Sequence, residues 1–215
     1  MIRLDIFSDP VCPWCAIGKA HLDRALEAHP DHPFRIEWHP FQLNPDMPKA
    51  GMDRPTYLAD KFGGPAAAAK IYARIEEAAN AAGIPIDFGT IPVMCNTLDA
   101  HRLIHWAGLE GRQTAVVSAL FKAYWREGRD IGAPAVLADI AEACGMERAL
   151  VERLLASDAD ADDIAARDAD ARAKGVTAVP TFLIAQQYVV SGAQSPEVWG
   201  NIIDELLDQI KAVEA

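Results

Sequence analysis

The chain has 215 residues, a formal charge of −11 and an apolar content of 51%. This length and composition can build a sizeable core, and one domain that carries an insertion is the economical arrangement. The acidic charge disfavours nucleic acid and anionic membranes as partners, since both select basic patches.

The N-terminal residues provide the first predicted strand, over residues 2–7. They lack the basic start, apolar stretch and small-residue cleavage site of a secretory signal. No apolar run approaches the roughly 20 residues needed to span a bilayer. We therefore expect a cytoplasmic protein, where structural disulfides are rare and a closely spaced cysteine pair is catalytic or binds a metal.

A Cys-Pro-Trp-Cys motif at residues 12–15 follows this strand. It precedes a predicted helix over residues 16–28 and a second strand over residues 34–40, which together form a β-α-β unit. The motif therefore lies at the N-terminus of a helix. The unpaired N–H groups and positive end of a helix stabilise a thiolate, which is the reactive form of cysteine.

Each residue of the motif has an expected role. Cys12 is the expected nucleophile. Cys15 lies one helical turn further on, where it can attack a mixed disulfide formed at Cys12 and release the reduced partner. Pro13 suits the first helical turn, because its ring presets φ and it lacks an N–H that would have no partner there. Trp14 is expected to be partly exposed and to contact substrate.

Two other interpretations of the cysteine pair remain open. A zinc site normally needs four ligands, and Cys95 and Cys144 have no partner cysteine nearby in the sequence. His101 and His105 are four residues apart, so a mixed Cys/His site is conceivable, but we expect no metal. The pair could also be structural, because cysteine is often simply buried; the strand-motif-helix context favours redox chemistry. Cys95 and Cys144 are expected to be buried thiols.

The middle of the chain, residues 54–174, is predicted to be helical, with strand-like sequence only at the two ends of the protein. It is rich in alanine, leucine and charged residues and is broken by turn signals. Amphipathic patterns predict helices over residues 97–106, 113–126 and 134–143. The acidic segment 157–174 has a narrow apolar stripe at Ile164, which predicts a helix with a solvated face.

The C-terminal residues return to strand patterns. Residues 181–185 and 188–191 are predicted strands around a tight turn at Gln186 and Gln187, followed by a helix over residues 195–213 with Ser195 as its N-cap. The two ends would form one mixed sheet. We thus predict an α/β, thioredoxin-like fold with a large inserted all-helical domain. Residues 1–45 and 175–215 would form the thioredoxin-like domain, and residues 46–174 the insertion.

Several separate motifs are spread over nearly the whole chain: 8-SDPVCPWC-15, 17-IGK-19, 38-WHPFQLNP-45, 96-NT-97, 100-AHRL-103, 175-GVTAVPTF-182 and 191-SGAQ-194. With these motifs in this order, the sequence resembles the DsbA family, most closely its FrnE-like branch. The departures are Ala16, where an aromatic residue is common, and Ala178, which replaces a frequent glycine. The resemblance implies a thioredoxin-like domain, an inserted helical domain and a cis bond before Pro180 that faces the dithiol.

With a cis bond, the backbone of Val179 would turn toward the active site and pair with an extended substrate segment, and Thr181 would lie beside the sulfurs. Val179, Pro180 and Thr181 are therefore the expected substrate-binding residues. His101 could act as a base or contact near Cys15, and Asn96 could line the same cleft, although a lone histidine on a helix is more often structural. The tryptophans outside the motif are expected to pack in the core.

The motif and the resemblance together predict a thiol-disulfide oxidoreductase, and more specifically a protein-disulfide oxidoreductase of DsbA type. Its substrate would be a thiol or a disulfide, either in a protein or in a small molecule. Apart from the redox-active disulfide no cofactor is expected, with glutathione as a possible co-substrate. In a reducing cytoplasm, reductase or isomerase activity is favoured over net disulfide formation. The sequence leaves the oligomeric state open.

Two alternatives remain. The first is a glutathione-dependent isomerase or transferase of the kappa-type or 2-hydroxychromene-2-carboxylate isomerase group, whose members generally carry serine in place of a cysteine pair. The second is a chaperone or binding module that uses an apolar cleft without turnover.

Overall fold

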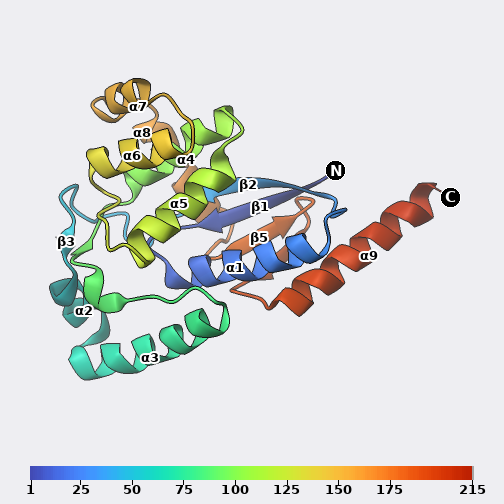
Figure 1. Ribbon diagram of the computed structural model, residues 1–215, viewed down its shortest axis with the longest axis horizontal. Helices are drawn as coiled ribbons and strands as arrows, with labels where there is room; N and C mark the ends of the chain where they lie inside the picture. Colours follow the sequence, from blue (N-terminus) through green and yellow to red (C-terminus); the bar gives the residue numbers. More distant parts are fainter. Residues whose placement is uncertain (215) are drawn as a thin grey trace.

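A four-stranded mixed sheet forms the centre of the computed structural model, which describes residues 1–214 (Figure 1). β1 runs parallel to β2 and antiparallel to β5, and β6 is antiparallel to β5. The sheet that the two ends of the sequence predict is therefore present. Its strands, in spatial order, are β2 (Phe34–Pro40), β1 (Ile2–Ser8), β5 (Thr181–Ile184) and β6 (Tyr188–Ser191).

The central strand β1 brings the N-terminal and C-terminal parts of the chain together. Ile6 is paired with Trp38 on β2 and with Phe182 on β5. Leu4 and Ile6 have no exposed surface, because β1 has a neighbouring strand on each side and its apolar side chains point into the core. The end of β1 consequently leads directly out of the core into the cysteine motif.

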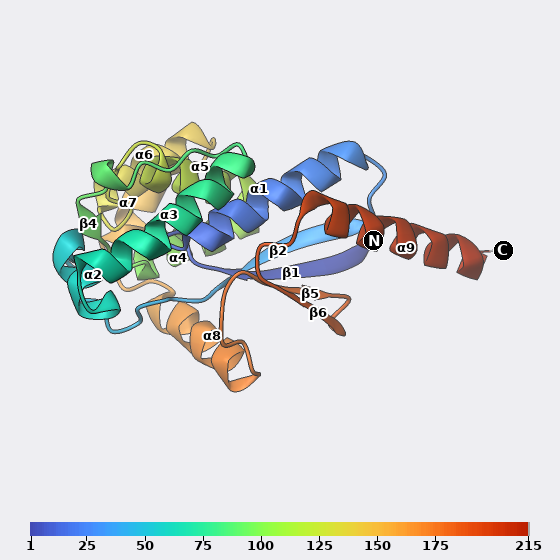
Figure 2. The same cartoon turned by 90° about the horizontal axis from the view of Figure 1, so that it is seen from below.

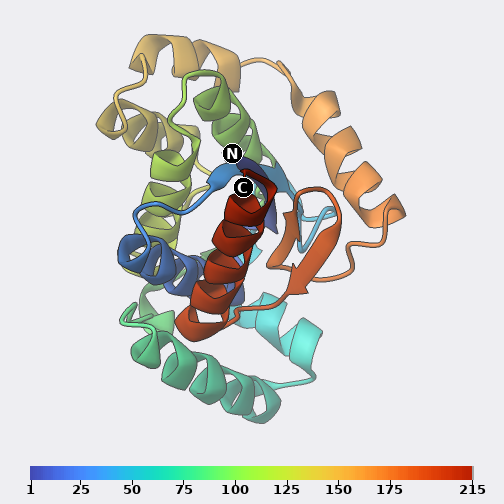
Figure 3. The ribbon, with the colours of Figure 1, turned by 90° about the vertical axis from the view of Figure 1, so that its right-hand side faces the viewer.

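Two helices cover one face of this sheet (Figures 2 and 3). They are α1 (Pro13–Ala28) and α9 (Pro196–Glu214), which pack against each other. Trp199 of α9 is fully buried and meets Phe182 of β5 edge to face, with 4.7 Å between the ring centroids. Ser195 precedes α9 as predicted, and its hydroxyl accepts a hydrogen bond from the amide of Val198 at 3.4 Å.

The segment between β2 and β5 supplies the other helices. Helix α8 lies on the opposite side of the sheet from α1 and α9 (Figure 2). Helices α4, α5 and α8 all contact β2, so the inserted helices pack directly on the sheet. The division into a thioredoxin-like domain of residues 1–45 and 175–215 and an insertion of residues 46–174 stays a prediction. The helices are α2 (Arg54–Phe62), α3 (Pro65–Ala81), α4 (Leu98–Leu109), α5 (Gln113–Trp125), α6 (Pro134–Ala143), α7 (Arg148–Leu155) and α8 (Ala161–Ala173), with a 3₁₀ turn at Phe88–Thr90.

Two sequence expectations need correction. The middle of the chain is not free of strands, because β3 (Met52–Asp53) pairs with β4 (Val93–Met94). Two-residue strands are too short to show an alternating pattern. The turn between β5 and β6 also begins one residue early, with positive φ at Ala185 and Gln186, and the amide of Gln187 closes it on the carbonyl of Ile184.

The tryptophans outside the motif lie in the core as predicted, with exposed fractions of 5% or less at Trp38, Trp106, Trp125 and Trp199. Among the described residues, no helix combines the length and the apolar character needed to cross a bilayer.

Candidate active site

The cysteine pair lies at the N-terminus of α1. Cys12 is the N-cap residue with extended backbone, and Pro13 occupies the first helical turn. The carbonyl of Cys12 accepts hydrogen bonds from the amides of Cys15 and Ala16, at 3.1 and 3.3 Å. Both cysteines are free thiols and nearly inaccessible, with 4% and 1% of their surface exposed. Trp14 is half-buried, so part of its surface is open to a substrate.

The loop before β5 faces these sulfurs. The Val179–Pro180 peptide bond is cis, and the Cys12 thiol points to the carbonyl oxygen of Val179 at 3.7 Å. The loop is held from both sides, because the Thr181 hydroxyl donates to the carbonyl of Ala178 at 2.7 Å and the amide of Gly192 donates to the carbonyl of Pro180 at 2.8 Å. The structure thus brings Cys12 and Val179 together, and directs the Thr181 side chain toward its own loop.

A glycine of α1 sets the distance between this loop and the helix. A Cβ atom on Gly18 would lie 3.0 Å from Cγ of Pro180 and 3.4 Å from Cα of Ala193. Any side chain at this position would therefore push the Pro180 loop away from the motif. The sequence places Gly18 in a recognisable run of residues but does not reveal this contact.

Comparisons with known proteins agree with this geometry. Residues 3–204 match the family model of the DSBA-like thioredoxin domain. The chain belongs to the DSBA-like thioredoxin family. The thioredoxin-like fold with a helical insertion, predicted from the sequence, is therefore confirmed; the FrnE-like branch stays a prediction.

Individual relatives cover nearly the whole chain of this DSBA-like protein. The probable DsbA oxidoreductase SCO1869 from Streptomyces coelicolor is 30% identical, with a TM-score of 0.85, over 95% of this chain and 89% of that one. YwbO from Bacillus subtilis is 27% identical over 206 residues, 95% of this chain and 96% of its own. The family membership thus extends over both the sheet and the inserted helices.

More distant structures share the fold. A 2-hydroxychromene-2-carboxylate isomerase is 18% identical with a TM-score of 0.74, over 99% of this chain and all of its own. The cytosolic disulfide reductase DsbM from Pseudomonas aeruginosa is 19% identical with a TM-score of 0.71, over 96% and 99% of the two chains. The same fold therefore occurs in proteins described as a reductase and as an isomerase.

Burial keeps the second cysteine protonated. Burial is the main cause that raises the pKa of Cys15 well above its usual value, and the neighbouring Cys12 raises it further. The Ser8 side chain and the Asp9 amide act in the opposite direction. Cys15 consequently needs a proton acceptor before it can attack.

Asp9, three residues before Cys12, is completely buried under the motif. Its carboxylate accepts hydrogen bonds from the amide of Val11 at 3.3 Å and from the amide of Leu43 at 2.7 Å. Burial raises its pKa to about 7, while these two amides and the Thr97 side chain act to lower it. A carboxyl group that titrates near neutral pH beside a reactive motif is a candidate for proton transfer.

His101 lies next to this carboxyl group. It is 3% exposed, and its Nε2 is 3.8 Å from Oδ1 of Asp9 without a hydrogen-bond partner among the described residues. Burial lowers the pKa of His101 to about 4, so the ring is neutral at neutral pH. The structure thus places the predicted His101 beside the buried Asp9, at a distance too long for a hydrogen bond.

Asn96 has a local structural role. Its side chain donates to the carbonyl of Met47 at 2.6 Å and accepts from the amide of Leu98 at 2.9 Å, which fixes the start of α4. Both ends of the amide group are therefore used within the protein.

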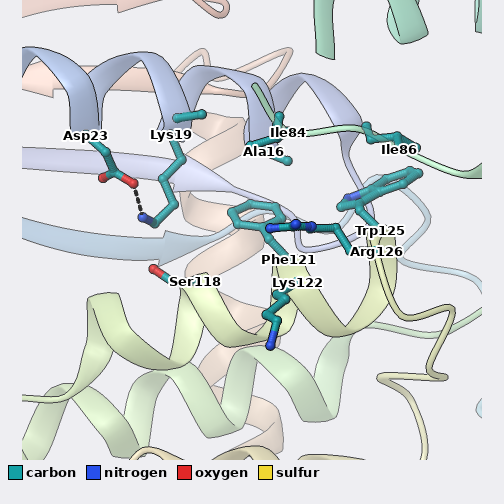
Figure 4. A pocket seen from close by; sticks show the side chains of 11 residues that line it. Ala16, Lys19, Asp23, Ile84, Ile86, Ser118, Phe121, Lys122, Trp125 and Arg126 are labelled. Atoms are coloured by element: carbon teal, nitrogen blue, oxygen red, sulfur yellow. Dashed lines mark hydrogen bonds and ion pairs between the residues drawn. The ribbon is translucent and has the colours of Figure 1, made fainter. Parts of the chain in front are cut away.

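Two hollows flank the motif, with Trp125 lining both. The first, of about 90 Å³, borders Val11 and Pro13 and is largely apolar. The second, of about 180 Å³, lies along α1 beside Ala16 (Figure 4). There, the buried Lys19 is paired with Asp23 at 2.5 Å. The indole N–H of Trp125 also donates to the carbonyl of Pro10 at 3.1 Å, which ties α5 to the motif loop.

One cluster could in principle hold a metal ion: Asp5, Glu37 and His39 offer ligand atoms within 4.8 Å of one another. The Arg3 guanidinium already pairs with Asp5 at 2.6 Å and with Glu37 at 3.4 Å, and His39 contacts Asp5 at 2.6 Å. The Arg3 guanidinium therefore bridges the two carboxylates, and the cluster is a network of ion pairs and hydrogen bonds on the sheet.

The remaining cysteines lie outside the motif. Cys95 is 3% exposed, and burial raises its pKa, so it is an inert thiol as expected. Cys144 corrects the prediction, because it is only half-buried at the C-terminal end of α6. The end of a short surface helix leaves its side chain partly open to solvent.

Proposed function

We propose that this DSBA-like protein is a thiol-disulfide oxidoreductase in which Cys12 is the nucleophile and Cys15 the resolving thiol. The observation that carries the proposal is the position of the Cys12 sulfur, at the N-cap of α1 and 3.7 Å from the Val179 carbonyl. The positive end of the α1 dipole lies at Cys12 and favours negative charge there. A substrate sulfur would approach between the motif and the Val179 loop.

The chemistry is two successive exchanges. The Cys12 thiolate attacks one sulfur of a substrate disulfide, forming a mixed disulfide and releasing the other substrate sulfur as a thiolate. Cys15 then attacks Cys12, forming the Cys12–Cys15 disulfide and releasing the second substrate thiol. Two electrons pass from the protein dithiol to the substrate, and the reverse sequence oxidises a substrate dithiol.

We propose a cytoplasmic location and the reductase or isomerase direction, with glutathione as a reductant. A reducing compartment keeps an oxidising dithiol reduced at equilibrium, so it is poised to attack disulfides. The shared fold with a protein described as a cytosolic disulfide reductase, also solved with glutathione, supports this direction.

The apolar hollow beside Pro13 bears on the substrate. It lies next to the nucleophile and has little polar lining, so an apolar group adjacent to the substrate disulfide would fit there. The Val179 carbonyl would line the opposite side of the approach.

Trapping of the mixed disulfide tests the proposal. A Cys15→Ser variant treated with oxidised glutathione should accumulate a stable adduct at Cys12, whereas a Cys12→Ser variant should not; mass spectrometry of peptides locates the adduct. In Cys15→Ser, an adduct at Cys144 and none at Cys12 would contradict it, as would a stable adduct at Cys15 in Cys12→Ser. Saturable glutathione binding by Cys15→Ser without any adduct would instead support the isomerase or transferase class.

A further inference from the structure

The hollow along α1 is the larger of the two that flank the motif, and the proposed disulfide exchange does not use it. Its walls come from α1, from α5 and from residues 84–86, which follow α3 (Figure 4). Its volume is about 180 Å³. One buried water takes roughly 10–15 Å³ by the same measure, so the hollow has room for an organic molecule of on the order of ten heavy atoms.

Most of the lining of this hollow is apolar. Phe121 and Trp125 of α5 line it together with Ile86, and all three side chains are buried. On the side of α1 the lining residues are Ala16 and Ala20, whose short side chains leave the space open. An apolar lining with a few polar groups is typical of sites for small molecules. A ring or a short aliphatic chain would displace water from these surfaces.

The charged groups of the hollow are mainly cationic, although the chain as a whole carries a formal charge of −11. Lys19, Lys122 and Arg126 line it, together with the carboxylate of Asp23. Lys122 is exposed and pairs with Glu127 at 3.1 Å. Arg126 is also exposed, at the rim, whereas Lys19 is only 7% exposed. The hollow therefore offers one buried cation and further positive charge at its rim.

The buried ammonium group of Lys19 has hydrogen-bond donors that the protein does not use. An ammonium group has three N–H donors. Among the described residues, Nζ of Lys19 makes one hydrogen bond, to Oδ2 of Asp23 at 2.5 Å. Figure 4 shows the Lys19 side chain extending from α1 toward α5. Donors of a buried charged group are costly unless an acceptor meets them, so the remaining donors call for an acceptor from outside the chain.

We propose that this hollow binds a small organic carboxylate with an apolar body, such as an arylalkanoate. The ligand carboxylate accepts hydrogen bonds from the unused donors of Lys19, and Arg126 adds positive charge at the rim. The apolar body lies against Phe121 and Trp125. Among the described residues, Trp125 is the one side chain that this hollow shares with the apolar hollow beside Pro13, so the two sites are separate.

Titration of the wild-type protein with 3-phenylpropionate, followed by calorimetry, tests the site. We expect saturable binding with a dissociation constant of about 1 mM or lower. Two related compounds should bind about tenfold more weakly or worse. The neutral 3-phenylpropionamide lacks the charge, and propionate lacks the ring. The measurement needs no disulfide exchange, so its result is independent of the oxidoreductase function.

Variants of the lysine pair place the ligand in this hollow. Lys19→Met keeps most of the side-chain length and removes the donors, so the affinity should fall about tenfold or more. Asp23→Asn should raise the affinity severalfold, because it removes a competing carboxylate and leaves the Lys19 charge to the ligand. Lys174→Met is the matched control and should bind normally. Lys174 forms the same i,i+4 pair, with Asp170 at 2.6 Å, at the exposed end of α8.

Three results would overturn the site. The first is the absence of saturable binding, or equal affinity for the carboxylate and its amide. The second is an unchanged affinity in both Lys19→Met and Asp23→Asn. The third is a loss of binding in Lys61→Met instead, which would place the ligand in the hollow beside Pro13 that Lys61 lines.

A further variant keeps the proposal testable if Lys19→Met does not fold. Ser118 lines the hollow from α5, so the larger side chain in Ser118→Leu should exclude the ligand. Wild-type affinity in this variant would contradict the proposal.

Discussion

The Cys12 sulfur lies 3.7 Å from the carbonyl oxygen of Val179, although the two residues are 167 positions apart in the chain. This contact exists because β1 is hydrogen-bonded to β5, with Phe7 opposite Thr181. The motif leaves the end of β1 just where the Val179 loop enters β5. The sheet thereby builds one side of the site from the N-terminal residues and the other side from the C-terminal residues.

Gly18→Ala should weaken this contact. An alanine in place of a helical glycine ordinarily stabilises a helix by up to about 1 kcal/mol. At position 18 the new Cβ would meet Pro180 at 3.0 Å, so we expect no such gain and a severalfold slower disulfide exchange. Gly200→Ala is the matched control in α9, where the neighbouring group is the His29 side chain beyond the other end of α1. Thermal unfolding and exchange rates check both; equal behaviour of the two variants would contradict the role of Gly18.

Trp125→Phe should disturb the motif from the side of α5. The change removes the N–H that binds the carbonyl of Pro10 and leaves that carbonyl without this partner, which costs about 1–3 kcal/mol. Disulfide exchange should slow as well, because Pro10 precedes the motif by two residues. Trp106→Phe loses a similar bond to Asp160, away from the motif, and should lower stability without slowing exchange. A normal exchange rate in Trp125→Phe would show that the bond is only structural.

The pKa shifts of Asp9 and His101 oppose each other in their effect on stability. The pKa of Asp9 in the folded protein is raised from 3.8 to about 7. Its contribution to the free energy of unfolding is therefore fully present near pH 4 and is lost as the pH rises to 7. The folded pKa of His101 is lowered from 6.5 to about 4, so its contribution is present above pH 6.5 and is lost as the pH falls to 4.

Single variants should separate these two contributions. Between pH 7 and pH 4, the unfolding free energy of Asp9→Asn should fall more steeply than that of the wild type, by on the order of 4 kcal/mol. In His101→Gln it should fall less steeply, by on the order of 3 kcal/mol. Denaturant unfolding at several pH values measures both. Parallel pH profiles in wild type and variants would show that neither group titrates abnormally.

The sequence was sufficient to predict the scaffold. The strands at the two ends and the motif at a helix N-terminus follow from local patterns, whereas the cis bond before Pro180 was implied by the family resemblance. The small cavity bordered by Ser8 and His101 could not be predicted, because its walls come together only after β1 and α4 have packed. Asp9 lies within a motif that the sequence analysis quoted, but its burial, which sets its pKa, depends on the loop at Leu43 and on Thr97.

Gly18 and Trp125 illustrate the same limit. A glycine inside a helix and a tryptophan in an amphipathic helix have ordinary structural explanations. Only the folded chain shows that the first touches Pro180 and the second binds Pro10. His101 is an intermediate case, since its place on one face of α4 was predicted and its position beside Asp9 was not.

The equilibrium reduction potential of the Cys12–Cys15 pair, measured against glutathione, tests the central claim most directly. We predict a reversible two-electron transition, with about 30 mV per tenfold change in the equilibrium constant, that is absent in Cys12→Ser and in Cys15→Ser. The position of the midpoint would assign reductase-like or oxidase-like activity. A wild-type protein without this transition, or a transition that persists in either variant, would contradict the claim that these two cysteines form the working redox couple.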